Sequence, residues 1–241
     1  MSGLVTYERD GEISRITFGD GKVNLMSTAM LTAIHDAFDQ AERDKTVVIL
    51  SATGKHFSAG FDTKIIATGT PEDHYRMVRA GAELALRILS FPMPVVAACH
   101  GNAFPMGAFL ILASDYRIAA DGNYKIGLNE VAIGITPPRF AVELARQRLT
   151  PAYLNRTAIL GEMFEPQEAC AAGFFDRVVF AADLQSTATQ AAEALCKINF
   201  ACHTLAKSRT RGAAARLIRQ VIDEDITMGN SNARAATHEP A

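Results

Sequence analysis

The chain has 241 residues, of which 49% are hydrophobic and 21% are charged, and its formal net charge at pH 7 is -2. This length and composition are typical of a soluble globular protein with a sizeable core, and the near-neutral charge gives no electrostatic case for nucleic acid or an anionic membrane as a partner. No stretch reaches the roughly 18 apolar residues that cross a bilayer, and the N-terminus has no signal-peptide pattern.

The cysteines indicate a reducing compartment. They show no paired spacing of the kind that binds a metal, and each lies in an apolar or helical context, so we interpret them as reduced thiols and expect a cytoplasmic protein without a metal site. The four are Cys99, Cys170, Cys196 and Cys202.

The first part of the chain predicts a β-hairpin, a helix and a buried strand. Residues 4–8 and 13–18 have strand character and flank Asp10-Gly11, a dipeptide suited to a tight turn. Ser27 or Thr28 can cap a helix with apolar residues at helical spacing, and the continuous apolar run 46–52 predicts a strand covered on both faces.

A turn of small residues follows at 56–62, where the backbone can approach a ligand closely. Residues 71–89 predict a helix that the prolines of Phe91-Pro92-Met93-Pro94 stop, and residues 94–99 predict another buried strand. This strand leads directly into the stretch from Gly101 to Glu130.

The stretch from Gly101 to Glu130 carries two features that point to chemistry. Pro105 starts an apolar helix, so the N–H groups near Met106 and Gly107 have no partner within that helix and can hold a negatively charged oxygen. Glu130 follows a short apolar strand, where burial can raise its pKa and make it a usable base. The alternative is an ordinary turn and a glutamate that caps a helix.

Downstream, the pattern predicts mostly helices and one more strand. A loop with Pro137-Pro138 precedes helices at 139–149, 150–160 and 165–172, a strand at 174–180, and helices at 184–198, 203–207 and 213–226. Buried strands that alternate with helices predict an α/β fold with parallel pairing, in which the loops at the strand ends bind ligands. We expect a core at 1–183, a helical region at 184–228 and a poorly ordered polar tail at 229–241.

Four motifs resemble, in order, those of the crotonase superfamily, the enoyl-CoA hydratases and isomerases. They are HFSAGFD, HGNAFPMGAFLILASDYRIAAD, YKIGLNEVAIGI and GEMFEPQEACAAGFFDRVV, and the likeness covers roughly residues 5–182. The resemblance implies a spiral of ββα units with a C-terminal helical region that caps the site and builds homotrimers, often paired into hexamers. It also implies an acyl thioester of coenzyme A as substrate, with no further cofactor.

The resemblance assigns roles to particular residues. In the family, two backbone amides hold the thioester oxygen, and these correspond to Phe61 and Met106; the catalytic glutamate corresponds to Glu130. The residues that correspond to the coenzyme-binding positions and their supporting loops are Lys22, Asn24, Ser58, Ala59, Asp62 and Gly107.

One position departs from the hydratase pattern. Hydratases carry a second glutamate three residues after the second amide donor, where this chain has Phe109. An apolar ring can neither orient a water nor transfer a proton, so the pattern favours a single-glutamate Δ3,Δ2-enoyl-CoA isomerase in which Phe109 helps to exclude water. Hydration, thioester hydrolysis, decarboxylation and a catalytically silent acyl-CoA-binding protein remain the alternatives.

Several other polar residues lie near the motifs. We interpret Asp62 as a side chain that stabilises the turn, and we interpret His56 and His100 as packed or solvated imidazoles. Arg139 and Lys207 are cations that could reach the coenzyme phosphates, with a solvated charge as the alternative for each.

Overall fold

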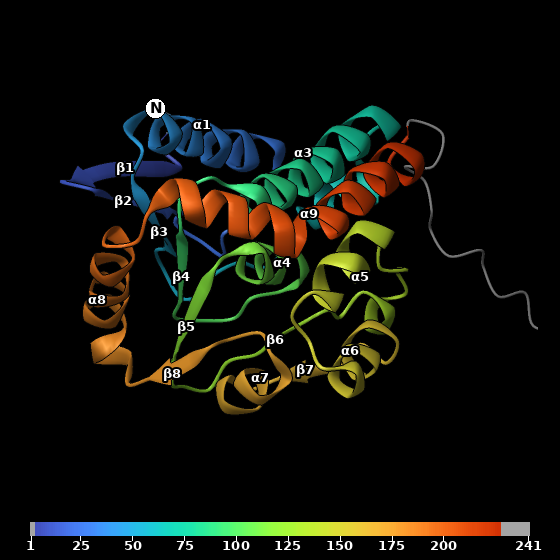
Figure 1. Cartoon of the computed structure of the whole chain (residues 1–241). Coiled ribbons are helices and arrows are strands. Elements are labelled where there is room, and N and C mark those ends of the chain that lie inside the picture. Colours follow the sequence, from blue (N-terminus) through green and yellow to red (C-terminus); the bar gives the residue numbers. More distant parts are fainter. Residues whose placement is uncertain (1–2, 228–241) are drawn as a thin grey trace, which may run out of the picture.

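The computed structural model describes residues 3–227 (Figure 1). In this part of the chain the strands are β1 (Val5–Asp10), β2 (Ile13–Phe18), β3 (Val47–Ala52), β4 (Val95–Cys99), β5 (Tyr116–Ala120), β6 (Ile126–Gly127), β7 (Met163–Phe164) and β8 (Arg177–Val179). The α-helices are α1 (Thr28–Asp44), α2 (Thr63–Thr68), α3 (Pro71–Ser90), α4 (Pro105–Ala113), α5 (Arg139–Arg146), α6 (Pro151–Ala158), α7 (Pro166–Ala172), α8 (Leu184–Cys196) and α9 (Phe200–Asp225). Two short 3-10 helices are η1 (Val131–Ile133) and η2 (Ala181–Asp183).

The main sheet has six strands in the order β1-β2-β3-β4-β5-β8. The hairpin pair β1 and β2 is antiparallel, and every later pair is parallel, as the alternation of buried strands and helices predicts. Of the Asp10-Gly11 dipeptide only Gly11 has a positive φ, because Asp10 is still paired with Ile13 and the loop consists of Gly11 and Glu12.

Alternate residues of the central strands enter two separate cores. Val48 and Leu50 pack on one face of the sheet with α1, α3 and α4, whereas Val47 and Ile49 pack on the other face against α8. Figure 1 shows α8 alone on its side of the sheet, with α1, α3 and α9 on the opposite side. The apolar run 46–52 is therefore buried on both faces, as predicted.

Three predicted helices and one predicted strand have other bounds in the structure. Helix α5 ends at Arg146 and not at residue 149. The strand expected at 174–180 is shortened to β8, because the chain turns at Gly173 with φ +106° before it joins the sheet. The two helices expected at 203–207 and 213–226 form one continuous helix, α9, whose Gly212 lies in its interior. Tertiary contacts of α9 with α3 and α5 offset the helix cost of one glycine, which is about 1 kcal/mol.

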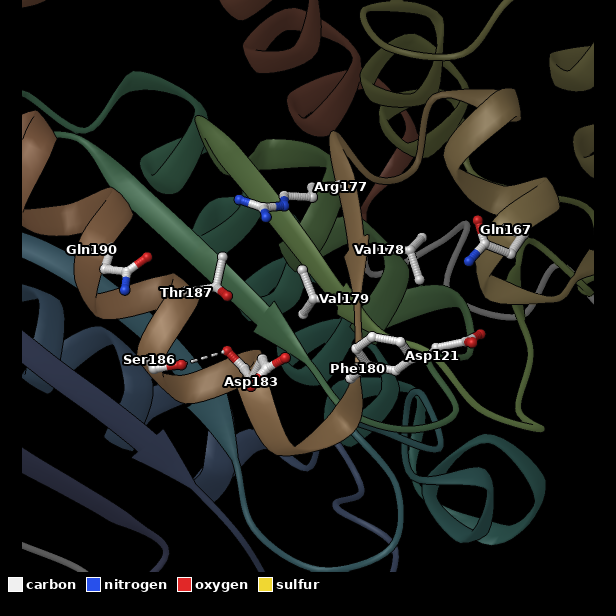
Figure 2. A pocket seen from close by; sticks show the side chains of 10 residues that line it. All are labelled: Asp121, Gln167, Arg177, Val178, Val179, Phe180, Asp183, Ser186, Thr187 and Gln190. Carbon is white, nitrogen blue, oxygen red and sulfur yellow. Dashed lines mark hydrogen bonds between the residues drawn. The ribbon is translucent and has the colours of Figure 1, made fainter.

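A second, smaller set of pairings connects the loops that carry the sequence motifs. Ser58 bridges Ala103 and Ala103 bridges Ile126, all in parallel, and β6 then pairs with β7. These bridges bring three motifs that are distant in the sequence to neighbouring positions. A hollow also opens at the far edge of the main sheet, between β8 and α8 (Figure 2).

No helix within residues 3–227 combines the length and the apolar character that a membrane span needs. The predicted boundary between a core and a helical region at residue 183 falls at the start of α8, but α8 and α9 both pack against the sheet or its helices. The division into two regions stays a prediction, and the tail predicted at 229–241 lies outside the described residues.

Candidate active site

The turn at 58–62 is held rigidly against the segment that precedes α4. Ser58 donates its backbone N–H to the Asn102 carbonyl (2.9 Å) and accepts from the Phe104 N–H (2.9 Å). The Ser58 hydroxyl donates to the Asn24 carbonyl (2.8 Å) and accepts from the Gly60 N–H (3.1 Å). All polar groups of Ser58 are thus used within the protein, so this residue shapes the turn.

Gly60 makes the sharp part of this turn possible. Its φ of +86° lies in the left-handed region that side chains disfavour, and an added Cβ would sit 3.5 Å from the Cβ of Phe104. Phe61 follows in an extended bridge to Met26, whose N–H donates to the Gly60 carbonyl at 2.8 Å. Among the hydrogen bonds of the described residues, none uses the N–H of Phe61.

The first turn of α4 offers a second such N–H. Phe104 is the N-cap and gives no side-chain hydrogen bond, Pro105 has no N–H, and the Ala108 N–H is already bonded to the Phe104 carbonyl at 3.0 Å. The N–H groups of Met106 and Gly107 are therefore the ones left without an intrahelical acceptor. Gly107 is required for packing, because a Cβ there would lie 2.7 Å from the Cβ of Ser58.

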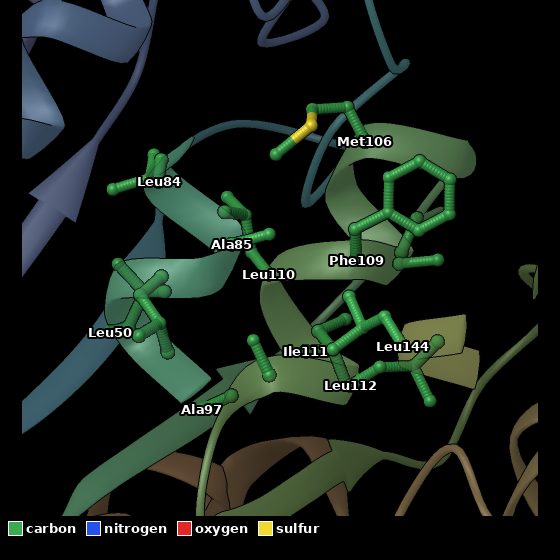
Figure 3. Packing of buried hydrophobic residues seen from close by; sticks show 14 of the residues in the cluster. Leu50, Leu84, Ala85, Ala97, Met106, Phe109, Leu110, Ile111, Leu112 and Leu144 are labelled. Carbon is green, nitrogen blue, oxygen red and sulfur yellow. The ribbon is translucent and has the colours of Figure 1, made fainter. Parts of the chain in front are cut away.

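Helix α4 is buried on every side, as the all-apolar sequence predicts. Figure 3 shows it enclosed by residues of β3, β4, α3 and α5, among them Leu50, Ala97, Leu84, Ala85 and Leu144. Full burial of residues from Met106 to Ala113 fixes the direction of the helix, and therefore of its first N–H groups.

The structure brings Phe61 and Met106 together at one glycine of α3. A Cβ added at Gly81 would lie 2.7 Å from the Phe61 ring and 2.8 Å from the Met106 Sδ, so both side chains meet the bare backbone of α3 at this position. The sequence analysis did not single out Gly81. The signal was present, because a glycine inside an otherwise helical pattern indicates a close approach by another group.

Glu130 follows β6 and two further residues, and it opens the 3-10 helix η1. Its carbonyl accepts hydrogen bonds from Ile133 (3.0 Å) and Ile135 (2.9 Å), which fix the backbone at this residue. Glu130 thus occupies the N-cap position of η1, as the alternative interpretation expected, but its side chain makes no capping hydrogen bond.

The carboxylate of Glu130 is buried, and one of its oxygens is unpaired. The residue is 6% exposed, and its Oε2 is sealed from solvent without a hydrogen-bond partner in the described structure. Loss of hydration raises the pKa of Glu130 from 4.5 to about 7, because burial disfavours the charged form. A carboxylate with this pKa is half ionised at neutral pH and can both accept and return a proton.

Phe109 lies one helical turn beyond Met106 in α4 and is 1% exposed. Its ring packs edge-on against Phe140 of α5, with the centroids 5.5 Å apart. The position that carries a second glutamate in hydratases is therefore a closed apolar contact in this chain. The resemblance identified only the residue type at position 109, whereas the structure shows that Phe140 is its contact partner.

Two candidate coenzyme residues hold loops in place. Asn24 has a φ of 58°, and its side-chain amide donates to the carbonyls of Thr53 (2.7 Å) and His56 (2.8 Å). Asp62 caps α2 by accepting from the Lys64 N–H at 2.9 Å, which confirms its interpretation as a stabiliser of the turn. Helix α2 itself was not predicted from the sequence.

The other two candidates lie in the same loops. Ala59 donates its N–H to the Val23 carbonyl at 3.0 Å, and Lys22 has an exposed side chain. Coenzyme binding by Lys22, Asn24, Ser58, Ala59, Asp62 and Gly107 stays a prediction.

Lys207 is not a free cation. Its ammonium lies 2.8 Å from Asp115 and also donates to the Phe91 carbonyl at 3.0 Å, and burial lowers the pKa of Lys207 to about 8. Arg139 forms ion pairs with Glu224 (2.9 Å) and Asp225 (3.1 Å). Both cations thus tie α9 to the rest of the fold, and Asp115 has a structural role that the sequence did not indicate.

His56 accepts a hydrogen bond at Nδ1 from the side-chain amide of Asn102 at 2.9 Å, and a ring nitrogen of His100 lies 2.8 Å from the Gly54 carbonyl. Both imidazoles are therefore engaged in loop contacts. Within residues 3–227 no group of three or more His, Cys, Asp or Glu side chains is arranged to hold a metal ion.

Two backbone N–H groups without an acceptor, those of Phe61 and Met106, lie on segments that are bridged to each other, and a buried carboxylate follows the next bridged segment. Two preorganised N–H groups suit an oxyanion, and a carboxylate with a pKa near 7 suits proton transfer. The common role of Phe61, Met106 and Glu130 in one reaction centre stays a prediction.

Comparisons with known proteins show which proteins this chain is similar to. Human mitochondrial enoyl-CoA delta isomerase 1 is 31% identical over 222 residues, covering 90% of this chain and 74% of the relative. Carnitinyl-CoA dehydratase of Salmonella paratyphi A is 32% identical over 198 residues, covering 81% of this chain and 75% of the relative. The crystal structure of an enoyl-CoA hydratase/isomerase family protein from Pseudomonas syringae superimposes with a TM-score of 0.90 at 41% identity, covering 92% of this chain and 96% of that one.

The family model described as enoyl-CoA hydratase/isomerase matches residues 8–238, which is nearly the whole chain. The fold, the motif order and the sequence match all lead to one conclusion. This chain belongs to the enoyl-CoA hydratase/isomerase family and has the crotonase fold.

Proposed function

We propose that this protein is a Δ3,Δ2-enoyl-CoA isomerase that moves the double bond of an acyl-CoA thioester by one position. The observation that carries the proposal is a lone buried carboxylate, Glu130, with no protein partner for its Oε2 and a pKa raised to about 7. The contact between Phe109 and Phe140 supports it, because no second acid occupies the position that hydratases use.

The reaction needs one base that acts twice. The Glu130 carboxylate removes a proton from C2 of the 3-enoyl thioester, and the electron pair of the broken C–H bond forms a conjugated enolate with negative charge on the thioester oxygen. The N–H groups of Phe61 and Met106 donate to that oxygen. Glu130 then returns its proton to C4, the double bond comes to lie between C2 and C3, and the substrate gains or loses no atoms.

The energetic demand on each group is moderate. Removal of a single oxyanion donor in other enzymes costs about 2.7–4 kcal/mol, so a pair of donors can supply much of the enolate stabilisation. Rigid N–H groups supply this without reorganisation, and the hydrogen bonds of Ser58 and the burial of α4 are what hold them. An apolar wall at Phe109 keeps water from the enolate, which favours return of the proton to carbon.

Hydration or dehydration is the second candidate. The similarity to carnitinyl-CoA dehydratase favours it, because that relative is as similar in sequence as the human isomerase. It would require a water or hydroxyl held by groups other than a second glutamate at position 109. The two activities differ in whether the mass of the substrate changes.

One experiment separates the candidates. The purified protein receives a 3-enoyl-CoA and, separately, a 2-enoyl-CoA, and conjugation is followed by ultraviolet absorbance and product mass by mass spectrometry. Conjugation of the 3-enoyl substrate without a change in mass is the expected result. Addition of water to the 2-enoyl substrate at a comparable rate identifies a hydratase, and binding of both without turnover identifies a silent acyl-CoA-binding protein.

We propose in addition that the protein forms a homotrimer, or a hexamer of two such trimers. Apolar side chains with exposed fractions of 43–68% gather where η1 meets the end of α6, and a Cβ at Gly161 would lie 2.9 Å from the Ala132 nitrogen. These side chains are Val131, Ile133, Ile159 and Leu160. Sedimentation of the wild type and of Ile159→Asp tests this: a trimer that dissociates in the variant is the expected outcome.

A further inference from the structure

The hollow between β8 and α8 is separate from the candidate active site. It measures about 640 Å³ and lies at the edge of the main sheet, on the side where α8 packs (Figure 2). None of the residues that line it belongs to the turn at 58–62, to α4 or to the segment from β6 to η1. A volume of this size is in the range that holds a small organic molecule.

Three of the side chains that line the hollow carry hydrogen-bond donors. Arg177 begins β8, and Thr187 and Gln190 lie three residues apart on α8 and therefore share a helix face. Figure 2 shows the Arg177 guanidinium directed toward the side of the hollow where Thr187 and Gln190 lie. In the described part of the chain, none of the three side chains has a hydrogen-bond or ion-pair partner.

The carboxylate that precedes Arg177 in sequence is already paired with another residue. Asp176 precedes Arg177 in sequence, but both its oxygens accept from Arg117 on the neighbouring strand, at 2.9 and 2.6 Å. Arg117 is buried and pairs with Asp176, whereas Arg177 is exposed. The guanidinium of Arg177 can therefore bind a ligand in the hollow. Two N–H groups of a guanidinium can bind the two oxygens of a carboxylate, and the Thr187 hydroxyl and the Gln190 side-chain amide can donate further hydrogen bonds to it.

The remaining lining residues restrict the charge and shape of a ligand. Asp121 and Asp183 also line the hollow, so a dianion such as phosphate would meet one cation and two carboxylates. These two carboxylates repel a monoanion less than a dianion, and Arg177 is the one cation among the lining residues that can attract it. Val179 and Phe180 add apolar surface, and the Phe180 ring is 76% exposed at the rim, where it can cover a hydrocarbon chain.

We propose that this hollow binds a small monocarboxylate, with its carboxylate on Arg177, Thr187 and Gln190 and its hydrocarbon part against Val179 and Phe180. The site is independent of the proposed isomerase chemistry, because it uses other residues on another part of the sheet. The binding step is non-covalent and needs no co-reactant.

The test uses the full chain and butyrate as the probe, with the dissociation constant measured by ligand-observed NMR or calorimetry. The variants are Arg177→Gln and, as a control with the same change in charge, Arg209→Gln on the exposed face of α9. We expect saturable binding to the wild type, at least tenfold weaker binding to Arg177→Gln, and unchanged binding to Arg209→Gln. Thr187→Val is expected to weaken binding by a smaller factor.

Two further probes decide the ligand class. Butyramide has the same shape without the charge and is expected to bind at least tenfold more weakly than butyrate, and inorganic phosphate is expected to bind more weakly as well. The proposal is overturned if the wild type does not bind butyrate, if Arg177→Gln binds it as well as the wild type, or if both arginine variants lose it equally. Tighter binding of phosphate than of butyrate overturns the assignment of a monocarboxylate.

Discussion

Gly81 faces the ring of Phe61 so closely that a Cβ on the glycine would lie 2.7 Å from the ring carbons. The same Cβ would lie 2.8 Å from the Met106 Sδ, so one backbone position of α3 supports both residues whose N–H groups we assign to the oxyanion. Distances below 3.0 Å require a shift of the ring or of the helix. The absence of a side chain at this position therefore leaves the space that the side chains of both residues occupy.

We expect Gly81→Ala to lower kcat/KM by about tenfold to 100-fold, because a displacement of about 1 Å at a catalytic group has effects of this size. Enoyl-CoA isomerisation measured by absorbance tests it. The control is Gly212→Ala in α9, where the nearest atom to the new Cβ is the flexible end of Arg216 at 3.5 Å. A Gly81→Ala enzyme with wild-type activity would show that this contact does not position the donors.

Glu130→Gln is expected to reduce kcat by about 100-fold to 10,000-fold, the usual contribution of a positioned base, while the affinity for the acyl-CoA changes little. The measurement is steady-state turnover together with binding of an unreactive acyl-CoA. Glu165→Gln serves as the control, because Glu165 is an exposed N-cap residue of α7 whose side chain makes no capping bond. Retention of most activity in Glu130→Gln would remove Glu130 from the mechanism.

The pH dependence of activity follows from the raised pKa of Glu130. The base must be ionised to take a proton, so kcat/KM is expected to rise with pH and to level off above about 7. A profile that levels off near pH 4.5, the ordinary range of a glutamate, would show that the free enzyme does not bury this carboxylate.

The free energy of unfolding is expected to fall as the pH rises, whereas kcat/KM is expected to rise. The pKa of Glu130 is raised on folding, so the folded chain binds more protons than the unfolded chain between pH 4.5 and about 7, and the free energy of unfolding falls as the pH rises through this window. A change from 4.5 to about 7 corresponds to about 3 kcal/mol as an upper figure. Urea unfolding of the wild type and Glu130→Gln at pH 5 and pH 8 tests this, and only the wild type is expected to lose this stability.

Asp115→Asn is expected to lower the free energy of unfolding by about 3–5 kcal/mol, because it leaves the buried ammonium of Lys207 without its charge partner. Arg211 also loses a 2.7 Å contact. Denaturant unfolding measures the effect, and Asp121→Asn, which alters an exposed turn, is the control. If Lys207 bound the coenzyme instead, its replacement by Met would raise KM for acyl-CoA at unchanged stability.

Phe109→Glu tests why this chain lacks a second acid. We expect the variant to gain hydration of a 2-enoyl-CoA relative to isomerisation, at a cost in stability of about 1–3 kcal/mol, because the ring contact with Phe140 is lost and a polar group is buried. Phe109→Leu is the control and is expected to keep isomerisation without hydration. Equal product ratios in both variants would show that position 109 does not select the reaction.

Much of the fold follows from local patterns in the sequence. Apolar runs at 46–52 and 94–99 predicted β3 and β4 as strands covered on both faces, and Pro105 with the apolar residues after it predicted the start of α4 and its complete burial. These features are readable because hydrophobic period, proline and capping residues act on the nearest few residues. The boundaries of α5, β8 and α9 were not readable, since contacts between distant segments decide where those elements end.

By itself, the sequence determined the residue types that the chemistry needs: a glutamate after a short strand, glycines at two turns and a phenylalanine at position 109. Only the tertiary structure decided that Glu130 is buried without a partner, that Phe61 and Met106 meet at Gly81, and that Lys207 is held by Asp115 rather than free. The physical reason is that burial, pKa and pairing depend on which distant groups surround a side chain, and the order of residues along the chain does not specify those neighbours locally.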